Sequence, residues 1–321
     1  MYECPNPTIR VVDSASIALL CGVFVLFLRS SDSDTVYEFS DVKYFHYDRN
    51  VDDPYGVYNW PKTFSRECNG QQQSPVNIET GSLSVDEFAS CPTMVYNSPV
   101  VQGTLINNGH SAEFLFYPGD LAAYNIPHRY GMYIAHDFHV HYGGLFESTT
   151  FDNQISPGSE HTVNGYRYDG ELHIVMYNSR YGSIEEAEHH ADGLAVLAFF
   201  IHKQPDSLDF GNRNMHFSIF LGSNLPYIAN INFSISTSLN LDVFRRQPCE
   251  FYTYSGSTTT PLCNQAVQWV IFREPLLVSR SAWSAIQLLE FTGDYDNRYG
   301  NFRVLQPLNG RVVESNFVPT F

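Results

Sequence analysis

Short strand-like segments separated by turn residues constrain the fold of this chain most strongly. The segments are rich in β-branched, aromatic and aliphatic residues, and clusters such as Asn107-Asn108-Gly109 bound them. Helical patterns are few, at residues 183–191 and 279–289. We therefore predict a mainly β domain with peripheral helices, and strands at residues 100–106, 112–117, 132–142, 171–177, 194–202 and 266–272.

The composition favours a single folded domain. Of the 321 residues, 43% are hydrophobic and only 16% are charged, which supplies a large core and argues against disorder. No linker, repeat or low-complexity tract interrupts the chain after residue 55, so we place the domain at residues 55–318. A formal net charge of -16 repels phosphate backbones, and we expect no nucleic-acid partner.

The N-terminal segment indicates export. Residues 15–28 form an apolar run that is shorter than the roughly 18–20 residues of a membrane-spanning helix. Arg10 precedes the run and small polar residues follow it, as in a signal peptide. We predict a signal peptide or a retained membrane anchor at residues 1–33, with a buried core helix as the alternative, and a linker or arm at 34–54. Secreted, periplasmic, cell-surface and organelle-lumen locations all remain open.

Six cysteines agree with an oxidising compartment. Cys4 and Cys21 belong to the leader, and no cysteine lies in a CxxC pair. Four cysteines in an exported domain predict two disulfides, with three possible pairings. A glycosylation sequon, Asn232-Phe233-Ser234, is meaningful only if the chain is exported. The four cysteines are Cys68, Cys91, Cys249 and Cys263.

Three histidines form a candidate metal site. His139 and His141 lie two residues apart on one predicted strand, so their side chains share a face, and His173 lies on another strand. Three imidazoles and one open position are typical of catalytic zinc. Asp137 and Glu171 each lie two residues before one of these histidines, where a carboxylate can take the second ring N–H. With 12 histidines in the chain, this spacing also arises without a metal.

Seven segments in order add a family resemblance. They are QSPVNI at 73–78, NNGH at 107–110, FHVHYG at 138–143, SEHTV at 159–163, ELHIV at 171–175, GSTTTP at 256–261 and QPLNGR at 306–311. Together they resemble the alpha-class carbonic anhydrases over about 250 residues. The resemblance implies a central twisted sheet of about ten mostly antiparallel strands, with Zn²⁺ at the base of a conical cleft.

The resemblance also implies a reaction, the reversible hydration of carbon dioxide to bicarbonate and a proton. His139, His141 and His173 match the zinc ligands. Thr259 matches the residue that accepts a hydrogen bond from zinc-bound hydroxide and donates one to Glu160. A hydroxyl group suits this position because it can accept and donate at once.

Further positions match the proton path, the substrate pocket and a disulfide. His110 matches the histidine that carries the released proton to buffer. The substrate-binding set comprises an apolar wall and two threonines, and Tyr47 matches a tyrosine that orders water in the cleft. Cys68 and Cys263 match a bridge of exported members, which leaves Cys91 with Cys249 as the second pair. The substrate-binding residues are Val175, Val196, Trp269, Thr259 and Thr260.

Several positions depart from the family pattern. Asp137 stands where a neutral amide is expected beside the first zinc ligand, and Glu113 replaces an amide in the cleft. Thr258 replaces a bulky apolar residue, and Tyr142 replaces a tryptophan. These residues bear on rate, pH optimum and inhibitor binding.

Two alternatives remain beside the enzyme. One is a catalytically weak binding or adhesion module on the same fold, which zinc content and turnover would identify. The other is a peptide-cleaving zinc hydrolase, which the sequence disfavours because it lacks an HExxH helix. Three ring nitrogens would also bind divalent ions other than zinc.

Overall fold

The computed structural model describes residues 45–64, 68–144, 155–208, 215–245, 249–292 and 299–319. All of them belong to one compact unit, Tyr44–Phe321. The expected leader at 1–33, Cys4, Cys21 and most of the expected arm lie outside the described residues. Among the residues that are described, no helix is long and apolar enough to cross a membrane.

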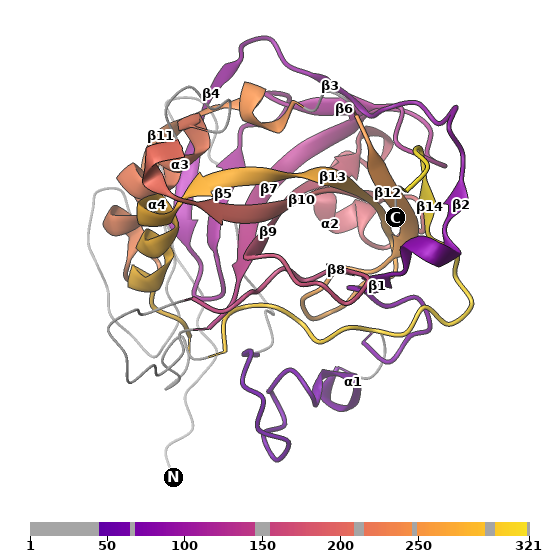
Figure 1. The fold of residues 1–321 in the computed structure, drawn as a ribbon, viewed down its shortest axis with the longest axis horizontal. Coiled ribbons are helices and arrows are strands. Elements are labelled where there is room, and N and C mark those ends of the chain that lie inside the picture. Colours follow the sequence, from indigo (N-terminus) through magenta and orange to yellow (C-terminus); the bar gives the residue numbers. More distant parts are fainter. Residues whose placement is uncertain are drawn as a thin grey trace, which may run out of the picture. The chain divides into compact units, whose positions relative to one another are not determined.

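A 12-stranded twisted sheet forms the centre of the unit (Figure 1). Its main path runs β11-β4-β5-β7-β9-β10-β13-β12-β14-β2, and β3 and β6 pair beside β7. Most pairings are antiparallel, but β10 with β13 and β14 with β2 are parallel. This architecture confirms the predicted mainly β domain built on a large, mostly antiparallel sheet.

The strands are β1 Asn77–Ile78, β2 Ser84–Val85, β3 Thr93–Val95, β4 Val100–Asn107, β5 Ala112–Phe116, β6 Ala122–Tyr124, β7 Tyr133–Tyr142, β8 Thr162–Val163, β9 Gly170–Asn178, β10 Leu194–Gln204, β11 Ser234–Asn240, β12 Phe251–Gly256, β13 Val267–Ser279 and β14 Glu314–Ser315. The helices are α1 Trp60–Thr63, α2 Ile184–Ala187, α3 Met215–Asn224 and α4 Arg280–Ser284. Short 3-10 turns cover Thr80–Ser82, Ser179–Tyr181, Asp206–Leu208, Leu225–Ile228, Leu241–Phe244 and Ala285–Leu288.

All six predicted strands are present, as β4, β5, β7, β9, β10 and β13. The helix expected at 183–191 is shorter, and the one at 279–289 becomes α4 followed by a 3-10 turn. Sequence patterns gave no signal for α3, β11 or β12. In β11, the sequence SISTSLN is mostly polar because only Leu239 is buried. In α3, apolar residues lie on several sides, including the exposed Ile219.

Side-chain alternation divides the core into two clusters on opposite faces of the sheet. One cluster contains Phe138, Val140 and Leu172, and helices α3 and α4 pack together beside β13 and β10 on the same side (Figure 1). The other contains Val196 and Trp269. Neighbouring residues on a strand point to opposite faces of the sheet. His139, His141 and His173 alternate with residues of the first cluster, so their side chains lie on the face of the second cluster.

The described part of the expected arm lies on the domain. Phe45 and Tyr47 are buried, and each ring contacts Trp60 edge-on at centroid distances of 5.3 and 5.4 Å. This small cluster also contains Cys68 and Cys263. Residues 45–48 are therefore buried against the unit, whereas residues 50–52 and 54 are exposed.

Both disulfides have the expected pairing. Cys68 is bonded to Cys263, 195 residues along the chain, and Cys91 to Cys249, 158 residues along. The first ties the segment after α1 to the loop after β12, and the second ties the segment before β3 to the segment before β12.

Candidate metal centre

Adjacent strands bring the three candidate ligands together. On β7, His139 and His141 share a face, and antiparallel pairing with β9 places His173 directly opposite His139. Ring centroids are 5.0 Å apart for His139 and His141, 5.4 Å for His139 and His173, and 4.6 Å for His141 and His173. One ring nitrogen from each histidine lies within 4.8 Å of the other two.

In His139 and in His173, one ring nitrogen is hydrogen-bonded to a carboxylate. The His139 Nδ1 atom lies 2.8 Å from Asp137 Oδ1, which leaves Nε2 for a metal. In His173 the roles are reversed: Nε2 lies 2.8 Å from Glu171 Oε1, which leaves Nδ1. A carboxylate that accepts one ring N–H fixes the tautomer and makes the other nitrogen a stronger metal ligand.

His141 supplies the third nitrogen. Its Nδ1 donates to the backbone carbonyl of Asn301 at 2.6 Å, and Nε2 is buried without a hydrogen-bond partner. Buried polar atoms almost always have a hydrogen-bond partner, so this unpaired nitrogen is suited to bind a metal. The three remaining ring nitrogens form a donor set that fits zinc.

Burial keeps two of these imidazoles neutral. Burial and then the neighbouring His139 lower the pKa of His141 to about 3. Burial and then His141 lower the pKa of His173 to about 4. Only neutral imidazole binds a metal, so these two ligands need lose no proton near pH 7.

In a second cluster, formed by His161, Glu171 and His173, the ligand atoms of His161 and Glu171 are already hydrogen-bonded within the protein. Glu171 Oε1 lies 2.7 Å from His161 Nδ1, and Oε2 accepts the His161 backbone N–H at 2.8 Å. The remaining nitrogen, His161 Nε2, lies 2.7 Å from the Tyr254 hydroxyl. Burial raises the pKa of Glu171, but His161 and His173 outweigh it and hold this pKa well below its ordinary value. The cluster orients Glu171 and is not a second metal site.

Thr259 and Glu160 lie beside the histidines. Glu160 is fully buried, and its Oε2 lies 3.6 Å from His141 Nε2. Burial raises the pKa of Glu160, while the neighbouring His173, the Arg303 backbone N–H and the Thr259 side chain act in the opposite direction. Glu160 Oε1 accepts the Arg303 backbone N–H at 2.8 Å. A carboxylate can only accept a hydrogen bond, so Glu160 can take one from the Thr259 hydroxyl group and leave the lone pairs of that oxygen for another donor.

Three apolar residues of the expected pocket form a row across adjacent strands. Val175 on β9 pairs with Val196 on β10, and Val196 pairs with Trp269 on β13. The Trp269 ring lies 4.8 Å from the His173 ring. Val196 and Trp269 are buried, Val175 is partly buried, and Thr260 is partly exposed beyond Thr259.

His110 contacts the N-terminal arm. Its imidazole stacks on the Phe45 ring at 4.0 Å and 14°, and its Nε2 lies 2.9 Å from the Phe45 carbonyl oxygen. A carbonyl only accepts, so Nε2 carries the hydrogen and Nδ1 remains able to accept a proton. Burial lowers the pKa of His110.

Two residues that depart from the family pattern, Glu113 and Thr258, have neighbours of different kinds. Glu113 on β5 is opposite His139 in the sheet, and its carboxylate accepts from Asn108 Nδ2 at 3.0 Å. Burial, followed by the nearby Asp137 charge, raises the pKa of Glu113. The Thr258 hydroxyl accepts the Asn264 backbone N–H at 3.0 Å, so this threonine stabilises the loop before β13.

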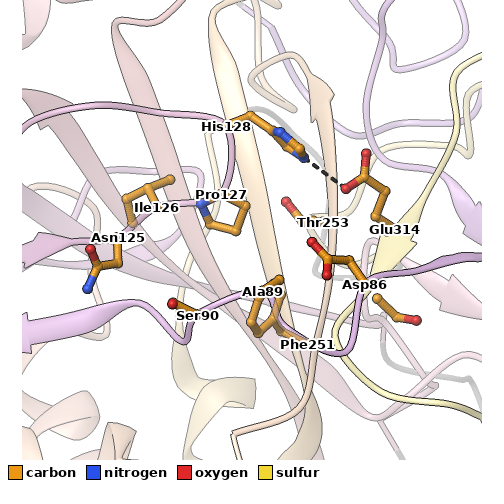
Figure 2. Close-up of a pocket in the computed structure, with 11 residues that line it drawn as sticks. Asp86, Ala89, Ser90, Asn125, Ile126, Pro127, His128, Phe251, Thr253 and Glu314 are labelled. Atoms are coloured by element: carbon orange, nitrogen blue, oxygen red, sulfur yellow. Dashed lines mark hydrogen bonds and ion pairs between the residues drawn. The ribbon is translucent and has the colours of Figure 1, made fainter.

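A cavity of about 310 Å³ lies elsewhere in the unit, and none of the three candidate ligands lines it (Figure 2). It lies between the segments that follow β2 and β6 and strands β12 and β14. His128 Nε2 and Glu314 Oε2 are 2.8 Å apart at this cavity (Figure 2). Volume alone therefore does not locate the candidate centre, whereas the unpaired ring nitrogens do.

Sequence reasoning missed several residues that support the site. Asn301 accepts from His141 and also donates through its side chain to the carbonyls of His110 and Val140, at 2.9 Å each. His161 orients Glu171 from a loop segment. His161 lies in the SEHTV segment, which could have drawn attention to it, but no local sequence pattern marks Asn301.

Comparisons with known proteins show the family of the chain. The model of the eukaryotic-type carbonic anhydrase family matches residues 55–317. Carbonic anhydrase 6 of Canis lupus familiaris is 33% identical over 271 residues, which cover 81% of this chain and 77% of that protein. Carbonic anhydrase 6 of Homo sapiens is 33% identical over 275 residues, covering 81% and 80%. Carbonic anhydrase 3 of Homo sapiens is 29% identical over 269 residues, covering 82% and 95%.

The family match spans the same residues as the sheet that assembles the three histidines, with Thr259, Glu160 and the apolar row around them. The chain belongs to the eukaryotic-type carbonic anhydrases.

Proposed function

We propose that the protein is a carbonate dehydratase, which catalyses the reversible hydration of carbon dioxide at a zinc ion held by His139, His141 and His173. The observation that carries the proposal is the set of three uncommitted ring nitrogens, of which His141 Nε2 is buried and unpaired. Zinc bound there supplies a Lewis acid that makes water a nucleophile near neutral pH, as it does in this family.

Thr259 orients the nucleophile. In this role the Thr259 hydroxyl group donates its hydrogen to the neighbouring Glu160, so its oxygen can only accept a hydrogen bond from the attacking group. That constraint aims a lone pair of the nucleophile at the carbon of the substrate. Glu160 is itself held by the Arg303 backbone N–H, so the orientation costs little reorganisation during the reaction.

The row of Val175, Val196 and Trp269 holds the substrate. Carbon dioxide is apolar, and a largely buried apolar wall next to His173 keeps it beside the nucleophile while excluding water. Bicarbonate is charged and binds such a wall poorly, which favours its release.

His110 carries the proton away. Nδ1 accepts the proton released by the reaction, and the imidazole then leaves the Phe45 carbonyl to discharge it to buffer. We expect His110→Ala to lower kcat about 10-fold or more in dilute buffer, at the low end of general acid–base contributions. Added imidazole should restore the rate. A loss that concentrated buffer cannot restore would contradict this role.

We also propose that the protein is exported. Two disulfides persist in oxidising compartments and are rare in the cytosol. Retention or cleavage of residues 1–33 decides whether the protein stays at a membrane. Mass spectrometry of the mature N-terminus after expression in a secretory host would distinguish the two.

The test of the enzymatic proposal is carbon dioxide hydration by stopped-flow, with zinc content measured on the same protein. We expect rapid hydration that disappears in His173→Ala, together with the bound zinc. The matched control is His216→Ala, an exposed histidine on α3, which should keep both. A folded, zinc-loaded protein without hydration would contradict the proposal and favour the non-catalytic binding module.

A further inference from the structure

A bulge in β7 brings an additional histidine to the metal centre. The pairing of β7 with β9 shifts register between Ala135 and Asp137, so His136 has no partner on β9. Successive residues of a regular strand point to opposite faces, but a bulge re-aims the side chain at the extra residue. Here the His136 ring turns to its neighbour, and its Nδ1 atom lies 3.0 Å from Asp137 Oδ2.

Asp137 is therefore held between two imidazoles. Its Oδ1 accepts from His139 Nδ1 at 2.8 Å, and its Oδ2 accepts from His136 Nδ1. The carboxylate is only 6% exposed. A buried charge is costly unless both oxygens are hydrogen-bonded, so the contact with His136 stabilises Asp137 in the orientation that serves His139.

His136 is not itself a candidate ligand. It belongs to neither of the histidine and carboxylate groups that converge within ligand distance among the described residues. Its side chain is 35% exposed, whereas the Asp137 carboxylate is buried. Glu113 on β5 and Glu185 on α2 add negative potential around it. His136 thus bonds to a buried carboxylate of the centre through a partly exposed side chain.

We propose that His136 is a positioning residue for the metal centre, which acts through Asp137 to fix the orientation and donor strength of His139. The inference rests on the proposed function, in which His139 is a zinc ligand. Without the His136 donor, Asp137 Oδ2 loses its hydrogen bond, the carboxylate turns to other donors, and His139 loses its fixed tautomer. Partners of this kind contribute about 10- to 100-fold to metal affinity.

The experiment compares His136→Leu, which removes the donor at similar size, with His136→Asn, whose amide nitrogen can replace Nδ1. Zinc affinity of the metal-free protein is measured by competition with a chelator, and the midpoint of the pH profile of carbon dioxide hydration is measured on the loaded protein. We expect His136→Leu to raise the zinc Kd about 10-fold, at the low end of that range, and to move the midpoint to lower pH. His136→Asn should restore both quantities to near wild type.

Equal zinc affinity in wild type and His136→Leu would overturn the inference, and so would an equal loss in the Leu and Asn variants. The zinc measurement needs no activity, so it separates this inference from the proposed function. If wild type binds zinc more tightly than His136→Leu but does not hydrate carbon dioxide, the proposed function is wrong and the role of His136 stands. If His136→Leu does not fold, zinc is titrated into the metal-free wild type, and the His136 ring signals are followed by NMR; unchanged signals would overturn the inference.

Discussion

At the scale of single residues, a few hydrogen bonds decide what each histidine does. His139 and His173 use opposite ring nitrogens for their carboxylates, so the free nitrogens are Nε2 in one and Nδ1 in the other. His161 has the same chemistry, but both of its nitrogens are occupied. Identical side chains thus become ligand candidates or supports according to which atoms remain unpaired.

Thr259→Val tests the orientation of the nucleophile. Valine has a similar size but cannot accept a hydrogen bond, so we expect kcat/KM to fall about 100-fold, as for loss of one oriented hydrogen bond. Zinc content should not change, because the candidate zinc ligands are His139, His141 and His173, and Thr259 is not one of them. Stopped-flow hydration with metal analysis measures both quantities. A parallel loss of zinc would instead assign Thr259 to the metal site.

His141 and His173 each lower the stability of the metal-free protein as pH falls below about 6.5. His136 and His139 act in the opposite direction, because burial lowers their pKa values but Asp137 outweighs it and raises them. His141 and His173 have folded pKa values of about 3 and about 4, so the unfolded chain binds their protons first. Each imidazole then contributes a slope of up to about 1.4 kcal/mol per pH unit, until pH falls below its folded pKa.

Urea unfolding between pH 7 and pH 5 measures this slope. His141→Gln should reduce it, whereas His216→Ala, at an exposed site, should leave it unchanged. An equal slope in wild type and His141→Gln would contradict the assignment.

At the scale of elements, register places the chemistry. The antiparallel pairing of β7 with β9 sets His139 opposite His173, and the β9-β10-β13 pairings align the apolar row. The bulge at His136 preserves this register while it adds one residue to β7. A shift by one residue would turn every one of these side chains to the opposite face.

Strand β11 lies at one end of the sheet path, and the sequon begins just before it. Asn232 is exposed in a left-handed turn with φ 66°, so its side chain is open to solvent. If the chain is exported, we expect an N-linked glycan at this residue, beside a strand edge that natural proteins tend to protect.

Expression in a eukaryotic secretory host should give a band that an N-glycosidase shifts. Asn232→Gln and Ser234→Ala should abolish the shift, and Ser234→Thr should keep it. A shift that survives Asn232→Gln would place the glycan elsewhere.

At the scale of the whole molecule, long-range bonds close the unit. The Cys68–Cys263 disulfide spans 195 residues and connects the aromatic cluster of the arm to the loop that follows Thr259. In the chain-entropy model, closing so long a loop stabilises the fold by about 5 kcal/mol.

A double Cys68→Ser, Cys263→Ser variant should therefore lose about 2–5 kcal/mol in its free energy of unfolding, measured by denaturant titration. Because the bridge lies next to the Thr259 loop, hydration should also fall. A loss below about 1 kcal/mol would contradict a large stabilising role.

The family resemblance implied that His173 completes the set of candidate ligands. The sequence by itself predicted the strands that carry the site, the shared face of His139 and His141, and the carboxylates two residues before His139 and His173. These follow from period-two alternation and from motifs that are local, so neighbouring residues suffice to read them. The two disulfide pairings also agree with the sequence-based expectation.

Only the tertiary structure decided the contacts between distant segments. Asn301 reaches His141 across 160 residues, and Phe45 stacks on His110 from the arm. The bulge that turns His136 toward Asp137 depends on how β7 pairs with β9. Strand β11 and helix α3 were not predicted, because neither has a regular pattern of apolar residues. Which of their residues are buried depends on the elements that pack against them. Local patterns record which face of an element is apolar, but not which distant backbone group completes a hydrogen bond.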